Sequence, residues 1–307
     1  MVSTYSKGII LAVLAACVSG VSIYINKFGI GFWTNATAYT TVKNIVAVIF
    51  LTSVLLMFKK TQELKLLSKK QWLRLFIIGI IGGSAPFLLF FKALTLISAS
   101  EAAFIHKTLF IWVAIFAYPL LKEKINYLQI FAFGLLLFSI YLFASPLKWS
   151  FGVSSLLALS ATLLWAIETV VAKTILKEIS STTTAWARMF FGSLILILWI
   201  FITGDVYSII PQTFNQIFWA TSTGIILFVY VSVWYKALEL APATTVSSIL
   251  VIAAPITTII DGLVLNGSLK TLKFIPLFIM LVSIILISNQ FETIYSIYKK
   301  RGKYFSS

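Results

Sequence analysis

The chain contains two copies of one unit. Residues 91–96 read FKALTL, and 144 positions later residues 235–240 read YKALEL. The same offset relates residues 139–142 (SIYL) to residues 283–286 (SIIL). If each unit crosses a membrane an odd number of times, the second copy must be inserted upside down relative to the first. Two inverted copies that face each other form the architecture of an alternating-access carrier.

The composition places both units in a membrane. The mean hydropathy is +1.01, and only 11% of the residues are charged, whereas soluble domains contain about a quarter. The single cysteine, Cys17, excludes an internal disulfide and a cysteine-based metal cluster. The sequence has no G-x-x-x-x-G-K loop for nucleotide phosphates. We therefore expect no cofactor, no metal site and no direct use of ATP.

Apolar windows of about 20 residues predict ten transmembrane helices. They cover residues 8–27, 36–58, 72–93, 99–121, 125–145, 150–174, 183–203, 213–237, 243–265 and 271–290. Because five fall in each copy, we expect an all-α membrane protein with two inverted five-helix repeats. Residues 1–146 would form the first repeat, and residues 147–307 the second repeat together with a basic tail.

The distribution of the net charge of +15 predicts the orientation in the membrane. Basic residues gather in short connections between spans and in the tail, at Lys59, Lys60, Lys65, Lys69, Lys70, Arg74, Lys122, Lys124, Lys177, Lys299, Lys300, Arg301 and Lys303. This pattern is typical of cytoplasmic loops and differs from a continuous nucleic-acid-binding face. We expect a multi-pass protein of the cell membrane with both termini in the cytoplasm and no nucleic-acid partner.

Ionisable side chains within the spans are the candidate functional groups, because burying them in hydrocarbon is costly unless they are paired or hydrated. For binding of substrate we select three cations and two lesser contacts: Lys43, Lys107, Arg188, Thr108 and Trp165. For proton coupling we select two carboxyl groups and the single histidine: Glu101, Glu168 and His106. A neutral imidazole bonded to a neighbouring helix is an equally good interpretation of His106.

Several of these cations have structural alternatives. Lys43 and Arg188 are 145 positions apart, so inversion would place one cation toward each mouth of a single path. Alternatively, both extend to lipid headgroups, or Glu168 pairs with Arg188 as a structural bridge. Lys27 and Lys173 lie at the ends of equivalent spans, where we expect them to extend to headgroups.

Two prolines and three aromatic residues inside the spans are also candidates. Pro86 and Pro255 free backbone carbonyl groups, which predicts kinks or hinges. Trp165, Trp234 and Tyr235 would line a pocket or, as the commoner role, pack between helices.

The ten spans in two inverted repeats, each opening with a glycine and an apolar run, resemble the EamA-type members of the drug/metabolite transporter superfamily. The resemblance extends to the K-A-L elements at residues 92–94 and 236–238. It also includes the Leu-Lys-Glu element at residues 121–123 and the proline, Pro255, of the corresponding span in the second copy. Two features depart from the family pattern. Residues 266–268 (NGS) stand where a glutamate is expected, and residues 106–108 (HKT) place charge where many members are apolar.

The resemblance implies a secondary active transporter and not an enzyme. We expect alternating access for a small polar metabolite, an amino acid or another anionic or zwitterionic organic solute, with the protein acting as an exporter or exchanger. A sugar-phosphate or nucleotide-type antiporter is the alternative, because relatives with such substrates use basic residues in the cavity. A membrane-embedded lipid-modifying enzyme would need clustered acids or histidines, which one histidine and nine dispersed acids do not provide. The expected partners are the substrate and the bilayer, and the expected assembly is a monomer or homodimer.

Overall fold

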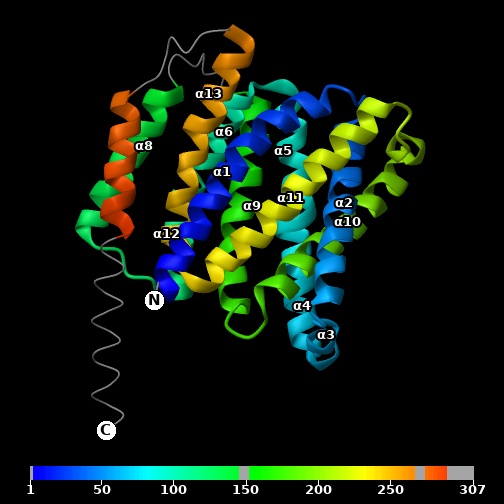
Figure 1. The fold of residues 1–307 in the computed structure, drawn as a ribbon, viewed down its shortest axis with the longest axis horizontal. Helices are drawn as coiled ribbons and strands as arrows, with labels where there is room; N and C mark the ends of the chain where they lie inside the picture. Colours follow the sequence, from blue (N-terminus) through cyan, green and yellow to red (C-terminus); the bar gives the residue numbers. More distant parts are fainter. Residues whose placement is uncertain (1–2, 145–151, 267–273, 289–307) are drawn as a thin grey trace.

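The computed structural model describes residues 3–144, 152–266 and 274–288, and its regular elements in these ranges are all helices (Figure 1). In the first half they are α1 (Thr4–Ile30), α2 (Ala36–Met57), α3 (Thr61–Leu66), α4 (Lys69–Ile78), the π-helix η1 (Gly79–Ser84), α5 (Ala85–Leu96), α6 (Ala99–Lys107), α7 (Leu109–Leu121) and α8 (Tyr127–Ala144). In the second half they are α9 (Val153–Ile175), α10 (Ser181–Thr203), η2 (Val206–Ile209), α11 (Phe214–Leu240), α12 (Ala243–Ile249), η3 (Leu250–Ile252), α13 (Ala253–Asn266) and an apolar helix at Phe274–Ser288.

Eight helical segments of the described residues are long and apolar enough to cross a membrane. They correspond to the first four predicted spans and to the sixth through ninth. The fifth and tenth correspond to two shorter apolar helices, Tyr127–Phe143 and Phe274–Ser288. Since a helix needs about 20 residues to cross the hydrocarbon core, the count of ten is not confirmed. The expected boundary between the repeats and the basic tail lie outside the described residues.

Three of the described spans are not continuous α-helices. One is the ninth, which consists of α12, the 3₁₀-helix η3 and α13. The third span consists of α4, η1 and α5, and Pro86 stands at the start of α5. The fourth consists of α6 and α7, which meet at Thr108. Irregular helical stretches of this kind, π-helices above all, often occur at functional sites.

Helices of the two halves contact each other throughout the bundle. α1 packs against α11 and α13, α9 packs against α5 and α7, and α2 contacts both α10 and α11. As drawn in Figure 1, α1 begins at the lower end of the molecule, whereas α9 ends there. The first helices of the two halves therefore run in opposite directions. The division into two five-helix repeats remains a prediction.

The glycines of η1 allow its backbone to touch α10. A Cβ atom on Gly83 would lie 2.1 Å from the carbonyl oxygen of Arg188, and one on Gly192 would lie 2.5 Å from the carbonyl carbon of Gly83. No larger residue fits at either position without separating the two helices. This crossing brings the third span of the first half against the second span of the second half.

The expectation that Lys27 and Lys173 extend to lipid headgroups is wrong: both side chains bind the ends of neighbouring helices. Each ammonium group donates to two carbonyl groups where the third span of its own half ends: Leu94 and Ile97 for Lys27, and Leu238 and Ala241 for Lys173. The last carbonyl groups of a helix have no partner within it, and they carry partial negative charge. A lysine at the end of an adjacent helix is therefore a suitable cap, and the same contact occurs in both halves.

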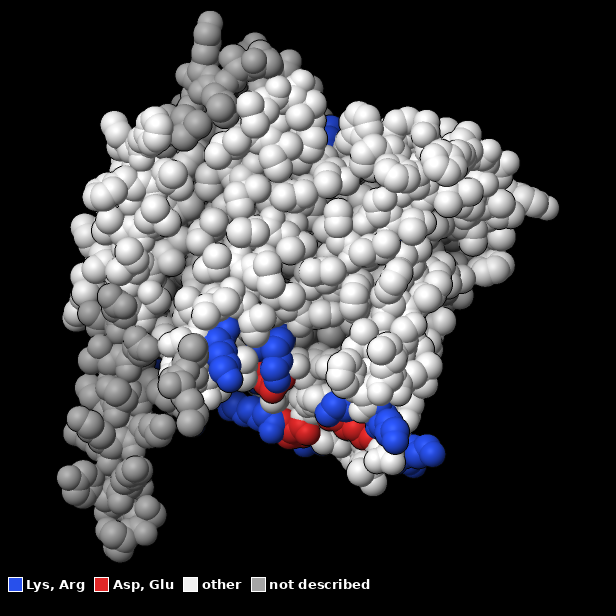
Figure 2. All heavy atoms as spheres, in the orientation of Figure 1, with Lys and Arg blue, Asp and Glu red and all other residues white. Residues whose placement is uncertain are grey.

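Figure 2 shows that lysine and arginine side chains gather at the lower end of the molecule. This is the end where α2 leads into α3 and α4, and where α9 leads into α10 (Figure 1). Two ties join the halves there: Arg74 bonds Glu178 at 2.9 Å, and Glu63 accepts hydrogen bonds from Ser180 at the start of α10. At the opposite end Asn35 donates to Asp205 at 2.9 Å.

Candidate functional site

A cavity of about 70 Å³ lies between the two halves, and eight helices contribute to its wall. Its polar lining residues are Ser19, Ser22 and Asn26 of α1, Lys43 of α2, His106 of α6, Glu168 and Thr169 of α9, and Arg188 of α10. Its aromatic lining residues are Phe87, Phe90 and Phe91 of α5, Trp165 of α9, and Tyr230 and Trp234 of α11. A space of this size holds only a few water molecules.

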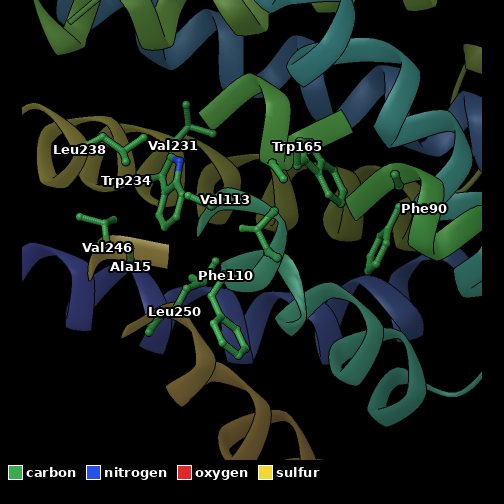
Figure 3. Close-up of a cluster of buried hydrophobic side chains, with 14 of the residues drawn as sticks. Ala15, Phe90, Phe110, Val113, Trp165, Val231, Trp234, Leu238, Val246 and Leu250 are labelled. Atoms are coloured by element: carbon green, nitrogen blue, oxygen red, sulfur yellow. The ribbon is translucent and has the colours of Figure 1, made fainter. Parts of the chain in front are cut away.

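The aromatic part of the wall continues into the core of the protein. Phe90, Trp165 and Trp234 belong to one apolar cluster, part of which is shown in Figure 3. The ring of Trp165 meets the ring of Phe90 edge-on at 5.3 Å between centroids. Because these side chains are packed on their far sides, the cavity wall is rigid where they form it.

Lys43 is buried in the cavity wall without a carboxylate partner. It is 1% exposed, and its Nζ donates to Oδ1 of Asn26 at 3.1 Å. The ammonium group also lies 3.6 Å from the centre of the Phe91 ring, which is a cation–π contact. Asn26 is held in place by a bond from its Nδ2 to the carbonyl oxygen of Ser22 at 2.7 Å. No described carboxylate lies within 4.0 Å of the lysine.

Arg188 of α10 is also buried near the ring of Phe87. It is 3% exposed, its Nη2 donates to the carbonyl oxygen of Gly82 at 3.0 Å, and its Nε has no partner. The guanidinium carbon lies 5.9 Å from the centre of the Phe87 ring, and Nζ of Lys43 lies 5.2 Å from the same point. The two cations therefore share one phenyl ring and one cavity.

Glu168 faces Arg188 but does not form the structural bridge that the sequence suggested. The carboxylate is 1% exposed and accepts a hydrogen bond from the hydroxyl group of Tyr235. A Cβ atom on Gly82 would lie 2.9 Å from both the Glu168 carboxyl carbon and Nε of Arg188, so the two groups are near neighbours. They are nevertheless not within 4.0 Å of each other as an ion pair. Arg188 thus retains free hydrogen-bonding capacity in the cavity.

His106 and Lys107 are neighbours in the sequence, but only His106 lies in the cavity wall, whereas Lys107 lies behind it. The imidazole lines the cavity and packs against the ring of Trp165, with 5.0 Å between centroids. Lys107 does not line it. Its Nζ donates to Oγ of Ser19 at 2.9 Å and lies 3.2 Å from Nδ1 of His106. Lys107 can therefore act on the cavity only through these two lining residues.

Five of the eight predicted site residues line one cavity: Lys43, His106, Trp165, Glu168 and Arg188. Lys107, Thr108 and Glu101 do not. The hydroxyl group of Thr108 donates to the carbonyl oxygen of Ile105 at 2.7 Å, where α6 ends. Glu101 lies in the first turn of α6 and accepts from Ser155 at 3.2 Å.

Four polar lining residues were missed from the sequence: Ser19, Ser22, Asn26 and Thr169. Asn26 and Ser22 lie four positions apart on α1, so they share a helix face. An amide within an apolar span needs a partner in the same way as a charge does, and this signal would have identified Asn26. Among the described residues, no three His, Cys, Asp or Glu side chains lie close enough together to hold a metal ion.

The helical architecture, with a cavity lined by residues of both halves, agrees with the comparison to protein families. The EamA-like transporter family matches residues 6–145 and again residues 153–289. The chain belongs to this family. It is similar to an uncharacterized transporter from Clostridium kluyveri, with 27% identity over 219 residues that cover 68% of this chain and 70% of that protein.

A solved structure described as "Crystal structure of protein" has a TM-score of 0.67 with 12% sequence identity. It covers 90% of this chain, which covers 95% of it. At that identity the likeness shows the fold alone. The family and the transporter-named relative show that this EamA-like protein is a multi-pass membrane transporter. Members of the family are generally not enzymes.

Proposed function

We propose that the protein is a secondary transporter for a small anionic or zwitterionic organic solute, and that Lys43 and Arg188 bind the anionic group. The observation that carries the proposal is the pair of buried cations in one cavity, neither of which has a carboxylate at ion-pair distance. A charge in the membrane interior costs several kcal/mol unless it is paired or hydrated. A carboxylate or phosphate of the substrate would supply the missing partner.

The aromatic residues of the wall suit the remainder of such a solute. Phe87, Trp165 and Trp234 present ring surfaces that accept apolar or flat groups, while Asn26 and Ser22 offer hydrogen bonds. The volume of about 70 Å³ favours a small organic acid or amino acid over the nucleotide-type alternative. A sugar phosphate remains compatible with the cations and is included in the test below.

Glu168 is our candidate for proton coupling, and His106 is the second. Glu168 is the carboxylate that lines the cavity among the described residues, and it lies beside Arg188. Transport in exchange for a proton requires a group that changes its protonation state during the cycle. When no substrate is bound, such a carboxyl group either carries a proton or, as an anion, interacts with a neighbouring cation. Glu101 lies off the cavity, so any part it has in coupling would be indirect.

Alternating access is supported by the geometry of the two halves. α1 and α9 run in opposite directions, the lysine caps of Lys27 and Lys173 recur, and the family matches the chain twice. We propose that two inverted five-helix halves, residues 1–146 and 147–307, open the cavity alternately to the two faces. The basic lower end would face the cytoplasm, together with both termini, in the cell membrane. We propose export or exchange as the direction, with a monomer or homodimer as the assembly.

The test is substrate-dependent stabilisation followed by flux. Purified protein is screened by thermal shift against amino acids, organic acids, phosphosugars and nucleosides, and each hit is tested in liposomes with and without a pH gradient. We expect a carboxylate- or phosphate-bearing compound to raise the melting temperature and to be transported. Lys43→Gln and Arg188→Gln should each reduce flux at least about tenfold, which corresponds to one lost charge-assisted hydrogen bond.

The matched control is Lys236→Gln, because Lys236 is a half-exposed lysine whose partner is Glu239 on its own helix. Its flux should be unchanged. Stabilisation by cationic or neutral compounds only, or full flux in both cavity variants, would rule out an anion site at Lys43 and Arg188.

A further inference from the structure

The third span contains a carbonyl group that lacks its usual α-helical donor, that of Gly82. In an α-helix the N–H of residue 86 would bond to the carbonyl oxygen of residue 82. Pro86 has no N–H, and the backbone there is π-helical: the N–H of Ala85 bonds to Ile80, five residues earlier. The oxygen of Gly82 therefore does not receive the α-helical hydrogen bond from residue 86, which leaves it open to donors from other helices.

Two cavity-lining side chains of the second half bind this oxygen. Nε1 of Trp165 on α9 and Nη2 of Arg188 on α10 each donate to it at 3.0 Å. Both side chains are buried, at 8% and 3% exposure, so neither bond is replaced by water at the surface. A single carbonyl group of the first half thus orients one aromatic and one cationic residue of the second half.

The absence of a side chain at residue 82 makes this approach feasible. A Cβ atom there would lie 2.4 Å from Cγ of Glu168 and 2.9 Å from Nε of Arg188. Any larger residue would push the carboxylate and the guanidinium group away from the carbonyl oxygen. Gly82 therefore provides both the acceptor and the space around it.

The bond also determines which part of Arg188 remains for the substrate. With Nη2 bonded to Gly82, the guanidinium plane is fixed, and Nε has no partner. Trp165, held by the same oxygen, packs against His106 and Phe90. The direction of one backbone carbonyl group therefore sets the position of two lining side chains and, through Trp165, the contacts of the imidazole.

We propose that the carbonyl group of Gly82, released from the helix by Pro86, is a positioning element of the substrate site that holds Arg188 and Trp165 in the cavity wall. The proposal gives Pro86 a defined role in place of a general kink. It rests on the proposed function only for its effect on transport, since the anchor itself can be observed without a substrate.

The first test is the indole N–H of Trp165 in protein labelled with ¹⁵N-tryptophan. The Trp165→Phe variant assigns its resonance among the nine tryptophans. Pro86→Ala supplies an N–H that competes for the Gly82 oxygen, so deuterium exchange of this indole should accelerate about tenfold, the effect of losing one hydrogen bond. Pro119→Ala is the matched control, because Pro119 also lies inside a helix but is exposed on the outside of the bundle. Exchange and resonance unchanged in Pro86→Ala would overturn the proposal.

A second variant keeps the test decisive if Pro86→Ala does not fold. Arg188→Lys retains the positive charge but removes the planar group that donates to Gly82. The Trp165 indole would then no longer share its acceptor, and its proton resonance should move. A resonance that stays in place in Arg188→Lys would contradict a shared anchor.

Transport separates positioning from simple structural support. With the substrate found in the flux assay, Pro86→Ala should raise KM about tenfold while the maximal rate stays within about twofold, and Pro119→Ala should change neither. Faster indole exchange with an unchanged KM would overturn the role in substrate binding. If the wild-type protein transports nothing, the proposed function fails, whereas the indole measurement still decides whether the anchor exists.

Discussion

At the scale of single residues, the buried cations should cost the protein stability. Lys43 is 1% exposed and has one hydrogen bond and one close ring contact to offset the loss of its hydration. Methionine has a similar length and carries no charge, so Lys43→Met removes the unpaired ammonium group without leaving a large cavity. We expect the variant to melt at a higher temperature, by roughly 2–4 °C for each kcal/mol of desolvation that is recovered.

Differential scanning fluorimetry in detergent checks this expectation. The matched control is Lys236→Met, which lies at the surface and should shift the melting temperature by less than about 1 °C. The same Lys43→Met protein should lose stabilisation by the anionic hits of the substrate screen. A lower melting temperature in Lys43→Met would show instead that the lysine is already well satisfied in the wall.

The sequence could identify the charged residues within the spans, but not which of them face the cavity. Lys43, Glu168 and Arg188 are conspicuous in apolar spans, and all three line the cavity. Lys107 is just as conspicuous but points to Ser19, because adjacent positions on a helix are about 100° apart and only His106 faces inward. Which of two neighbours lines the cavity depends on the rotation of α6, and periodicity in so short a helix does not determine it.

At the scale of helices, acidic residues of the connections fasten the ends of neighbouring spans. Glu63 of α3 accepts from the backbone N–H of Ser180 at 2.8 Å and from Oγ1 of Thr183 at 2.6 Å. Partial burial opposes ionisation of Glu63, but these hydrogen bonds outweigh it, so its pKa lies below the usual value. Glu123 fastens the start of α12 in a similar way, through Ala243 and Thr244.

The lowered pKa of Glu63 predicts a pH-dependent contribution to stability. A carboxyl group whose pKa is depressed in the folded state stabilises the fold above its unfolded pKa of about 4.3 and loses that contribution as the pH falls through the folded value. Glu63→Gln should therefore melt below the wild type at pH 7, and the difference should shrink below about pH 4. Melting curves from pH 7 to pH 3 measure this difference.

The control is Asp205→Asn, which changes an exposed acid at the opposite end of the molecule and should show a smaller difference. A gap between Glu63→Gln and wild type that is constant with pH would contradict this role.

The composite third span shows where sequence reasoning reaches its limit for helices. Pro86 and the glycines at residues 79, 82 and 83 predict an irregular helix that a neighbouring helix can approach closely. The structure has a π-helix, η1, at this position, and η1 packs closely against α10. The partners of the released carbonyl group come from residues 165 and 188, which are distant in sequence. Their identity depends on how α9 and α10 pack against η1, which local propensity does not encode.

At the scale of the whole molecule, the repeat predicts opposite directions for the two halves, but not how deeply they interlock. Offset identities such as residues 91–96 and 235–240 indicate two copies, and apolar windows locate the spans. The cavity arises because α1 crosses to α11 and α9 crosses to α5. These contacts between the halves build the wall of the cavity, and no pattern within one half contains them.

The inverted arrangement makes a prediction about two equivalent loops. Lys65 follows the second span of the first half, and Tyr207 follows the second span of the second half; both are exposed. In inverted repeats, equivalent loops lie on opposite sides of the membrane, and the basic loop lies inside. In a background where the single cysteine is replaced, Cys17→Ala, we expect Tyr207→Cys to react with a membrane-impermeant maleimide on intact cells. Lys65→Cys should react only after the cells are permeabilised.

The two labels separate the two parts of this claim. Labelling of both cysteines from the same side would contradict inversion, because equivalent loops would then share a face, and the alternating-access proposal would lose its geometric basis. Labelling with the sides exchanged would leave inversion intact and reverse the orientation. In that case the basic loops around Lys65 would lie outside the cell. Their charge could then not be explained by retention of the loops in the cytoplasm. It would instead be explained by electrostatic attraction of anionic substrates to the entrance of the cavity.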